Sequence, residues 1–243
     1  MMNTPFLRIR HFFAGMAALT LLCLCPMLTA QSISTAPKAV LFQTLALNAP
    51  VSNLFYELKG KPVPIQASTS DLSRLYETDA DRKVSIFRLV PSPDPAAPPR
   101  RITVATLNLN ESHPYLVLLT GSSKPESITA NALEDSWQNH PEKTFRIINR
   151  SKRKIAVQLG AEEQIIESGQ SPVFQSAGSG YDFDFKMASW EGDHWGLRVQ
   201  APQSIIPGTR ATIVVSDPTP TPNEANPTGL SMTTVFDDKQ LIK

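Results

Sequence analysis

The sequence has only two cysteines, Cys23 and Cys25, and both lie within its first thirty residues. Beyond them the chain has no thiol to act as a nucleophile and no disulfide to staple a small fold, so we expect apolar burial to hold it together. Histidine is also sparse there. His113, His140 and His194 fall in three separate regions, which argues against a histidine-based catalytic centre.

Long apolar runs are absent except near the start of the chain. Phe12–Leu24 is mostly apolar, follows the basic residues Arg8 and Arg10, and is followed by the small-residue site Leu28-Thr29-Ala30. This order is typical of a secretory signal peptide, and the run is shorter than the roughly 20 residues of a membrane helix. We therefore predict a cleaved signal peptide at residues 1–30 and an exported protein, periplasmic or secreted, with no membrane span after cleavage. A retained anchor is the alternative.

Neither sign of charge dominates the sequence. The chain has 23 Lys and Arg against 22 Asp and Glu, and loss of Arg8 and Arg10 would move the net charge from +1 to about −1. Nucleic acids are bound by concentrated basic faces. The densest basic run, residues 150–154, is short and falls between two predicted strands, so we expect no nucleic-acid partner.

Short segments of alternating polarity make up most of the chain. In Ile155–Leu159 and in Tyr181–Phe185, apolar residues alternate with polar or small ones, as in strands that bury one face. Turn residues such as Lys59-Gly60, Ser168-Gly169 and Pro207-Gly208 separate these segments at short intervals. Many short strands with frequent turns favour β-sandwiches or small barrels.

The same order of strands and turns occurs twice, first from Val40 to Gly121 and again from Thr144 to Asp217. The matched segments are Leu54–Leu58 with Ile155–Leu159, Ile65 with Ile165, Val84–Val90 with Tyr181–Met187, Ile102–Leu107 with Leu197–Val199, and Tyr115–Leu119 with Ala211–Val215. This repetition predicts two similar modules in tandem. A loose chance match between β segments is the alternative.

We therefore predict an all-β protein of two tandem antiparallel β-sandwich-like modules with a short connecting helix. The predicted parts are the signal peptide at 1–30, a first β module at 31–123, a linker with a short helix at 124–143, a second β module at 144–217, and a Pro/Thr-rich flexible tail at 218–243. The helix is expected over Ile128–Asn139, because Thr129 suits its N-cap and Leu133 and Trp137 lie four residues apart on one face.

Three segments of the second half follow one another as a strand, a strand and a turn. They are Phe145–Asn149, Ile155–Gly160 and Glu167–Ser171. The pattern resembles the opening strands of small secreted bacterial β-sandwich modules of unknown function. The resemblance covers about thirty residues, and it implies export and β architecture without a known active site.

A hairpin near the end of the second half is the first candidate contact site. If Met187 opposes Leu197 and Phe185 opposes Val199, then residues 191–193 form a three-residue loop. In this register Ser189 lies opposite Trp195, and Trp190 lies opposite His194.

Because faces alternate along a strand, Trp195 would point inward and Trp190 outward, next to Glu191, Asp193 and His194. An exposed tryptophan suits stacking on a sugar ring or anchoring in a protein pocket. The structural alternative is that Trp190 packs over a neighbouring strand or over the junction between the modules.

The loop Pro91–Pro99 is the second candidate contact. It places five prolines between two predicted strands. Proline fixes φ and lacks an N–H, so we predict a stiff, extended arm whose Pro93 and Pro95 dock into an aromatic groove of a partner. A solvated hairpin loop is the alternative.

No residue pattern points clearly to catalysis. Asp182 and Asp184 share one face of a strand, whereas a glycosidase needs two carboxylates across a cleft. Asp79 and Asp81 lack the further oxygen ligands of a calcium site. We therefore predict no cofactor, no metal and no enzymatic activity.

The predicted function is that of an exported structural or protein-interaction module of the cell envelope or periplasm, with an envelope protein as its partner. The alternative is a carbohydrate-binding module that uses Trp190 as a platform for a glycan.

Overall fold

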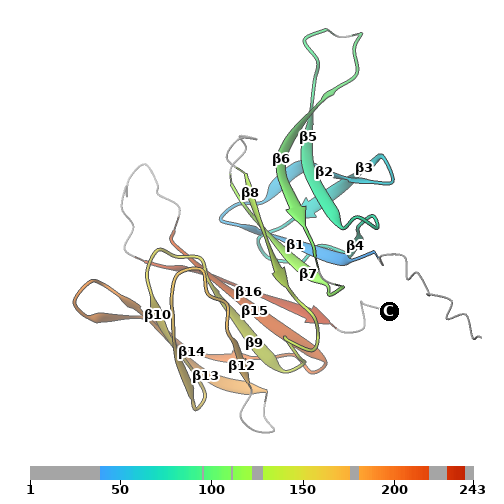
Figure 1. Cartoon of the computed structure of the whole chain (residues 1–243). Helices are drawn as coiled ribbons and strands as arrows, with labels where there is room; N and C mark the ends of the chain where they lie inside the picture. Colours follow the sequence, from blue (N-terminus) through green and yellow to red (C-terminus); the bar gives the residue numbers. More distant parts are fainter. Residues whose placement is uncertain are drawn as a thin grey trace, which may run out of the picture. The chain divides into compact units, whose positions relative to one another are not determined.

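The computed structural model describes residues 39–94, 96–110, 112–121, 128–175, 181–218 and 229–238, and their regular structure consists entirely of β-strands (Figure 1). The first eight are β1 (Leu41–Leu47), β2 (Val51–Leu58), β3 (Lys61–Ala67), β4 (Tyr76–Glu77), β5 (Lys83–Val90), β6 (Arg100–Asn108), β7 (Tyr115–Thr120) and β8 (Thr129–Glu134). The next eight are β9 (Thr144–Asn149), β10 (Ile155–Leu159), β11 (Glu162–Ile166), β12 (Val173–Gln175), β13 (Asp182–Trp190), β14 (Trp195–Ser204), β15 (Thr209–Ser216) and β16 (Ser231–Asp238).

These strands form four sheets that pair into two sandwich-like modules. The first module contains the sheets β4-β1-β7-β8 and β3-β2-β5-β6, and the second contains β12-β9-β15-β16 and β11-β10-β13-β14. Adding eight to each strand number of the first module gives the order in the second. Each module also has one parallel pair, β1 with β7 and β9 with β15. The predicted all-β class and the two sandwich-like modules are therefore confirmed, but the prediction that the modules are antiparallel is wrong for the pairs β1–β7 and β9–β15.

Most of the predicted correspondence between the halves agrees with the strand register. The β2–β3 hairpin turns after Leu58, and the β10–β11 hairpin turns after Leu159. The match between Tyr115 and Ala211 also holds, because they pair with Phe42 and Phe145, which are the second residues of the equivalent strands β1 and β9.

One predicted match is wrong by a single residue. Ile65 lies opposite Leu54, and the matching position opposite Ile155 is Ile166, which is fully buried. Ile165, the predicted counterpart of Ile65, points to the other face and is 59% exposed. A shift of one residue in a strand exchanges its buried and its exposed sides.

A β-bulge occupies the same place in both modules. The register shifts between Ile86 and Phe87 where β5 meets β6, and between Met187 and Ala188 where β13 meets β14. Ile86 and Met187 occupy matching positions, opposite β2 and β10 respectively. The predicted match of Val84–Val90 with Tyr181–Met187 is therefore wrong, and β5 corresponds to the part of β13 that ends at the hairpin.

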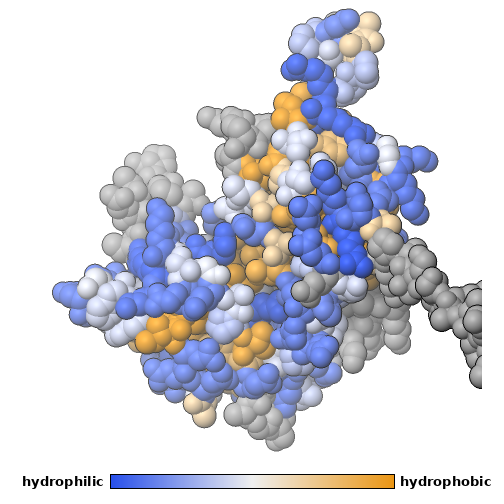
Figure 2. All heavy atoms as spheres, viewed as in Figure 1, coloured by the Kyte–Doolittle hydropathy of each residue, from blue (hydrophilic) through white to orange (hydrophobic). Residues whose placement is uncertain are grey.

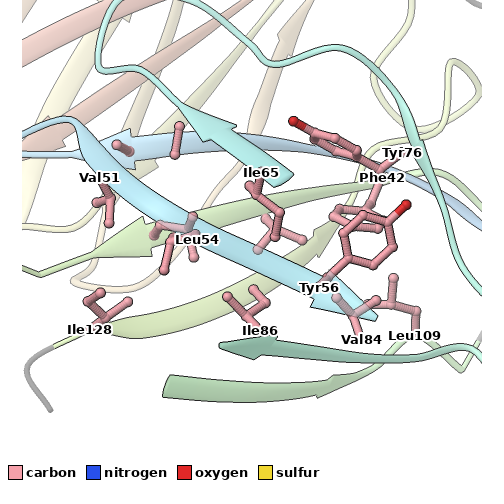
Figure 3. Packing of buried hydrophobic residues seen from close by; sticks show 14 of the residues in the cluster. Phe42, Val51, Leu54, Tyr56, Ile65, Tyr76, Val84, Ile86, Leu109 and Ile128 are labelled. Carbon is pink, nitrogen blue, oxygen red and sulfur yellow. The ribbon is translucent and has the colours of Figure 1, made fainter. Parts of the chain in front are cut away.

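Each module has its own apolar core between its two sheets. In the first core the rings of Phe42, Tyr56 and Tyr76 meet with centroids 5.3 to 5.6 Å apart (Figure 3). The two tyrosine hydroxyls reach backbone partners, because Tyr56 donates to the Glu77 carbonyl at 3.0 Å and Tyr76 accepts from the Gln66 N–H at 2.8 Å. In the second core Phe145 meets Phe183 edge to face.

A third apolar cluster joins the two modules. Its buried members come from β1, β7, β9, β15 and β16, and they are Leu45, Leu47, Leu116, Leu118, Ile148, Val214 and Val235. These side chains point away from the two module cores, so the central strands bury both faces. The chain from Ala36 onward accordingly forms one compact unit.

The predicted connecting helix over Ile128–Asn139 is wrong. Thr129–Glu134 is the strand β8, which pairs antiparallel with β7 along its whole length. Ala130 and Ala132 pack on the first core, whereas Leu133 packs on the third cluster. Leu133 and Trp137 have helical spacing, but the segment forms a strand. Pairing with β7 supplies the hydrogen bonds that its backbone N–H and C=O groups would otherwise make within a helix.

Residues 135–143 cross the second module and are held there by buried charges. The Arg210 guanidinium, only 1% exposed, donates to Asp135 at 2.8 Å and to Asp237 at 2.7 Å, and it lies 4.3 Å from the centre of the Trp137 ring. Arg146 donates to the other Asp135 oxygen at 2.6 Å. Although burial would raise the pKa of Asp135, the hydrogen bond from His140 and the charges of both arginines lower it below its usual value.

His140 belongs to the same buried cluster. Its two ring nitrogens face oxygens of Asp135 at 3.2 Å and of the Ala211 carbonyl at 3.1 Å. A neutral ring can donate to only one of them. Burial nevertheless lowers the pKa of His140 despite Asp135, with the charges of Arg146 and Arg210 acting in the same direction.

The predicted flexible tail, 218–243, contains the strand β16. It pairs with β15 from Thr209↔Asp238 to Ser216↔Ser231 and places Val235 in the third cluster. Its three apolar residues, Met232, Val235 and Phe236, do not alternate along the chain, so the sequence pattern did not indicate a strand. The predicted signal peptide, residues 1–30, lies outside the described residues.

The buried cluster leads to a first prediction. Asp135→Ala leaves Arg146 and Arg210 buried without their shared carboxylate, so it should lower the free energy of unfolding by about 3 to 5 kcal/mol. Urea unfolding followed by circular dichroism measures this. Asp193→Ala, which removes an exposed carboxylate, is the control and should change the free energy by less than about 0.5 kcal/mol. A loss below about 1 kcal/mol for Asp135→Ala contradicts the prediction.

Candidate functional site

The β13–β14 hairpin places Trp190 directly opposite Trp195. The Glu191 N–H donates to the His194 carbonyl at 2.9 Å, and Gly192 adopts a positive φ of 101° within the turn. The predicted pairing of Trp190 with His194 and the predicted three-residue loop are therefore wrong.

Trp195 was expected to point inward and instead lies on the outer face with Trp190. The β-bulge is the cause. Met187 pairs with Val199 on the core face, but the next pair is Ala188 with Leu197, so Arg198 is skipped. The extra residue reverses the alternation of β14 on the hairpin side of the bulge.

The two tryptophans of the hairpin contact each other and a lysine. Their ring centroids are 5.3 Å apart at 66°, and the Lys154 ammonium lies 4.9 Å from the centre of the Trp190 ring. Trp190 is half-buried, whereas Trp195 is 38% exposed. The face of Trp190 is thus engaged within the module, as the structural alternative proposed.

Glu191 fastens the base of this hairpin. Its carboxylate accepts a hydrogen bond from Ser189 and forms ion pairs with Arg198 and, at 3.4 Å, with Arg153. Arg198 also donates to Ser189 at 2.7 Å. The hydrogen bonds from Ser189 and Arg198, helped by the charges of Arg198 and Arg153, lower the pKa of Glu191 to about 2. Its oxygens therefore serve the hairpin itself.

Asp193 and His194 form the exposed tip of the turn. Their side chains are 87% and 68% exposed, and His194 Nδ1 lies 2.6 Å from Asp193 Oδ1. Both residues face solvent, where a partner can reach them.

The proline-rich loop is the counterpart of this hairpin in the first module, because it joins β5 to β6 (Figure 1). Pro93 is exposed, and Pro95 lies outside the described residues. Asp94 closes a turn, since its carbonyl accepts from the Ala97 N–H at 3.1 Å and its carboxylate accepts from the Ala96 N–H at 2.9 Å. The tip is therefore a hydrogen-bonded turn, and the predicted stiff, extended arm is wrong there.

The carboxylates considered for catalysis or calcium bind neighbouring groups. Asp182 accepts from the Ser204 hydroxyl at 2.6 Å. Asp79 accepts from the Lys59 N–H at 2.9 Å, and Asp81 accepts from the Lys83 N–H at 3.1 Å. Within the described ranges, no group of three or more His, Cys, Asp or Glu is placed to hold a metal ion.

An exposed apolar row on the second module was not expected from the sequence. Ile165, Ala156, Ala188 and Leu197 lie side by side across β11, β10, β13 and β14, all on the outer face. Ile165 is 59% exposed and Leu197 is 60% exposed. Figure 2 shows hydrophobic side chains at the surface of the molecule among the hydrophilic ones. We call these four residues the alanine row.

The alanine row and the tryptophan hairpin form one surface. Trp190 and Trp195 lie one row further along β13 and β14, on the same outer face. The bulge explains why sequence reasoning missed the row: Leu197 and Trp195 look like continuations of the buried alternation that ends at Val199.

A separate cavity of about 600 Å³ lies in the first module, beside β2, β3 and the loop before β4. Its lining includes Asn53, Gln66 and Asp71. Asp71 accepts a hydrogen bond from Ser70 at 2.7 Å. None of the predicted contact residues lies there.

Compared with known proteins, the chain matches no family model and no curated protein. None of the segments that the structure describes forms a helix with the length and hydropathy needed to cross a membrane.

The bonds of Glu191 lead to a second prediction. Ser189→Ala removes the hydrogen bond that lowers this pKa most, so the pKa of Glu191 should rise from about 2 toward its ordinary value of 4.5. Because the folded pKa is the lower one, these bonds stabilise the fold above pH 4.5, and their contribution is lost as the pH falls toward 2.

Carboxyl carbon shifts followed by NMR across this pH range measure the pKa. The control is Ser204→Ala, which removes a similar hydroxyl from Asp182 and should leave Glu191 unchanged. An unchanged Glu191 pKa in Ser189→Ala refutes the assignment.

Proposed function

We propose that this chain is a non-enzymatic exported protein that acts by binding another protein in the envelope or periplasm. The observation that carries the proposal is the alanine row with its neighbouring tryptophans. Exposed, contiguous apolar side chains on an otherwise polar sheet are typical of protein-binding surfaces. The proposed export rests on the leader pattern of residues 1–30.

The state of the ionisable groups supports a binding role. Four groups with shifted pKa values, Asp135, His140, Arg146 and Asp237, are buried together and bound to one another, to Arg210 or to the backbone. Catalytic groups need to reach a substrate. These groups instead hold residues 135–143 against the second module.

The geometry of the tryptophans favours a protein partner over a glycan. Sugar rings stack on a flat, open aromatic face. Trp190 meets Lys154 over its ring and Trp195 at 66°, so the two indoles do not form one plane. Glu191, which follows Trp190 in the sequence, has its carboxylate occupied by Ser189 and Arg198. A carbohydrate-binding module remains the second candidate because Trp195 is 38% exposed.

The third prediction concerns capture of the partner. In affinity capture from the native envelope fraction, Leu197→Asp should lower the affinity for the captured protein by about thirtyfold, because a charge replaces an apolar anchor. Quantitative mass spectrometry across a dilution series measures this. Ile206→Asp is the control, since Ile206 is 56% exposed but lies in the turn before β15.

Two outcomes contradict the proposed function. One is the absence of any protein whose capture depends on Leu197. The other is saturable quenching of tryptophan fluorescence by a soluble glycan that is lost in Trp195→Ala, which would make the chain a carbohydrate-binding module.

A further inference from the structure

The two modules differ at one matching pair of positions on their outer sheets. Phe55 lies opposite Phe87 in β2 and β5, and Ala156 lies opposite Ala188 in β10 and β13. Phe87 and Ala188 both follow the bulge directly. These two facing positions beside the bulge, which we call the frame, therefore hold two phenylalanines in the first module and two alanines in the second.

The first module covers this place with its own side chains. The rings of Phe55 and Phe87 stack with centroids 6.0 Å apart, and the Arg101 guanidinium lies 4.6 Å from the centre of the Phe87 ring. Arg101 is held there by an ion pair with Glu57. Phe87 is only 2% exposed as a result.

The second module leaves the same place open. Ala156 and Ala188 are both partly exposed, and the longer Ile165 and Leu197 stand on either side of them. The residue that matches Arg101 is Trp195, which contacts Trp190 instead of the alanines. The row therefore offers two short side chains between two exposed aliphatic ones.

We propose that the alanine row binds an aromatic side chain presented by an extended segment of a partner protein. The inference rests on the proposed function and names the chemistry of the partner. The first module shows that phenyl rings fit this frame, because Phe55 and Phe87 fill it there. The segments after residue 38 that lie outside the described residues contain no Phe, Tyr or Trp, so none of them can supply the ring.

Two lysines define the charge of the partner segment. Lys154 and Lys186 lie on the outer face on opposite sides of the alanine row, Lys154 two residues from Ala156 along the chain and Lys186 two residues from Ala188 along β13. Among the described residues neither forms an ion pair with a carboxylate. A cavity of about 290 Å³ adjoins Lys186 and is also lined by Asp184, Gln200 and Pro202, so the surface is indented on that side of the row.

The spacing of these lysines sets the length of the segment. Lys186 lies opposite Gln158, which is four residues from Lys154 along the strand, or about 13 Å. An extended segment with the pattern acid-x-aromatic-x-acid spans the same distance and presents all three side chains to one side. Glu163 lies level with Lys186 on the other side of Gln158, and Asp184 lies two residues beyond Lys186. Both carboxylates therefore disfavour further acidic residues in the partner.

The fourth prediction uses a synthetic probe, the labelled peptide Gly-Asp-Ser-Phe-Ser-Asp-Gly, and the full processed chain. Fluorescence polarisation should show saturable binding. Replacing the phenylalanine by alanine should weaken it at least about tenfold, because the buried ring is lost. Replacing both aspartates by lysine should abolish it.

Matched variants of the protein locate the site. Ile165→Asp should weaken binding at least about tenfold. Ile206→Asp, the same change at a residue of similar exposure, should have no effect. The double variant Ala156→Phe/Ala188→Phe installs the filling of the first module, so it should remove binding while keeping or raising the melting temperature.

Three results overturn this inference: no saturable binding of the peptide, equal binding by Ile165→Asp and Ile206→Asp, or undiminished binding by the double phenylalanine variant when its melting temperature shows that it is folded. The envelope capture separates this failure from that of the proposed function. A protein partner that depends on Leu197 but is retained by the double variant would contradict only the aromatic occupant.

Discussion

The fold depends on central strands that bury apolar side chains on both of their faces. β1 and β7 form a parallel pair in the first module, and β9 and β15 form one in the second. One face of each pair builds the core of its module, and the other contributes to the third cluster. Strands buried on both sides need nearly continuous apolar sequence. Because these inner sheets are covered, the sheets β3-β2-β5-β6 and β11-β10-β13-β14 are left to differ on their outer faces.

The buried charges of the second module fix the position of residues 135–143, which apolar packing alone would not determine. Arg146, Arg210 and Asp237 project from the inner sheet toward residues 135–143, where a purely apolar contact would have been enough to exclude water. Each charge requires a partner once it leaves water, so the arrangement tolerates only the crossing path that brings Asp135 and the carbonyls of Ser136 and His140 to the guanidiniums. Direction and position of the crossing segment are thereby specified more narrowly than by apolar contact alone.

Local alternation of apolar and polar residues was enough to predict the all-β class and the repeated strand order, because single short segments such as Ile155–Leu159 show it. Features set by pairing between distant strands were out of reach. Arg198 has no partner residue in the β13 register, and the sequence of β14 shows regular alternation before and after it. The reversal of Trp195 and Leu197 to the outer face therefore cannot be recognised without β13. β8 and β16 form by pairing with β7 and β15, and this pairing is not visible in their own sequences. One was therefore expected to be a helix and the other a flexible tail. For the candidate site, Trp190 was correctly placed outward, whereas the neighbouring alanine row depends on four strands at once.

The two outer sheets differ at four matching positions whose side chains contact one another in the first module. Phe55, Phe87, Arg101 and Glu57 act as a set in the first module, and their counterparts Ala156, Ala188, Trp195 and Gln158 lack every part of it. Loss of Phe87 would leave Arg101 without the ring that it covers, and loss of Arg101 would leave Glu57 without its ion pair. In the second module Ile165 and Leu197 are 59% and 60% exposed, so only part of the roughly 1.5 to 3 kcal/mol from full burial of each side chain is realised within the chain, and the rest is available to a ligand. A frame that stabilises the fold in one module is therefore free to supply binding energy in the other.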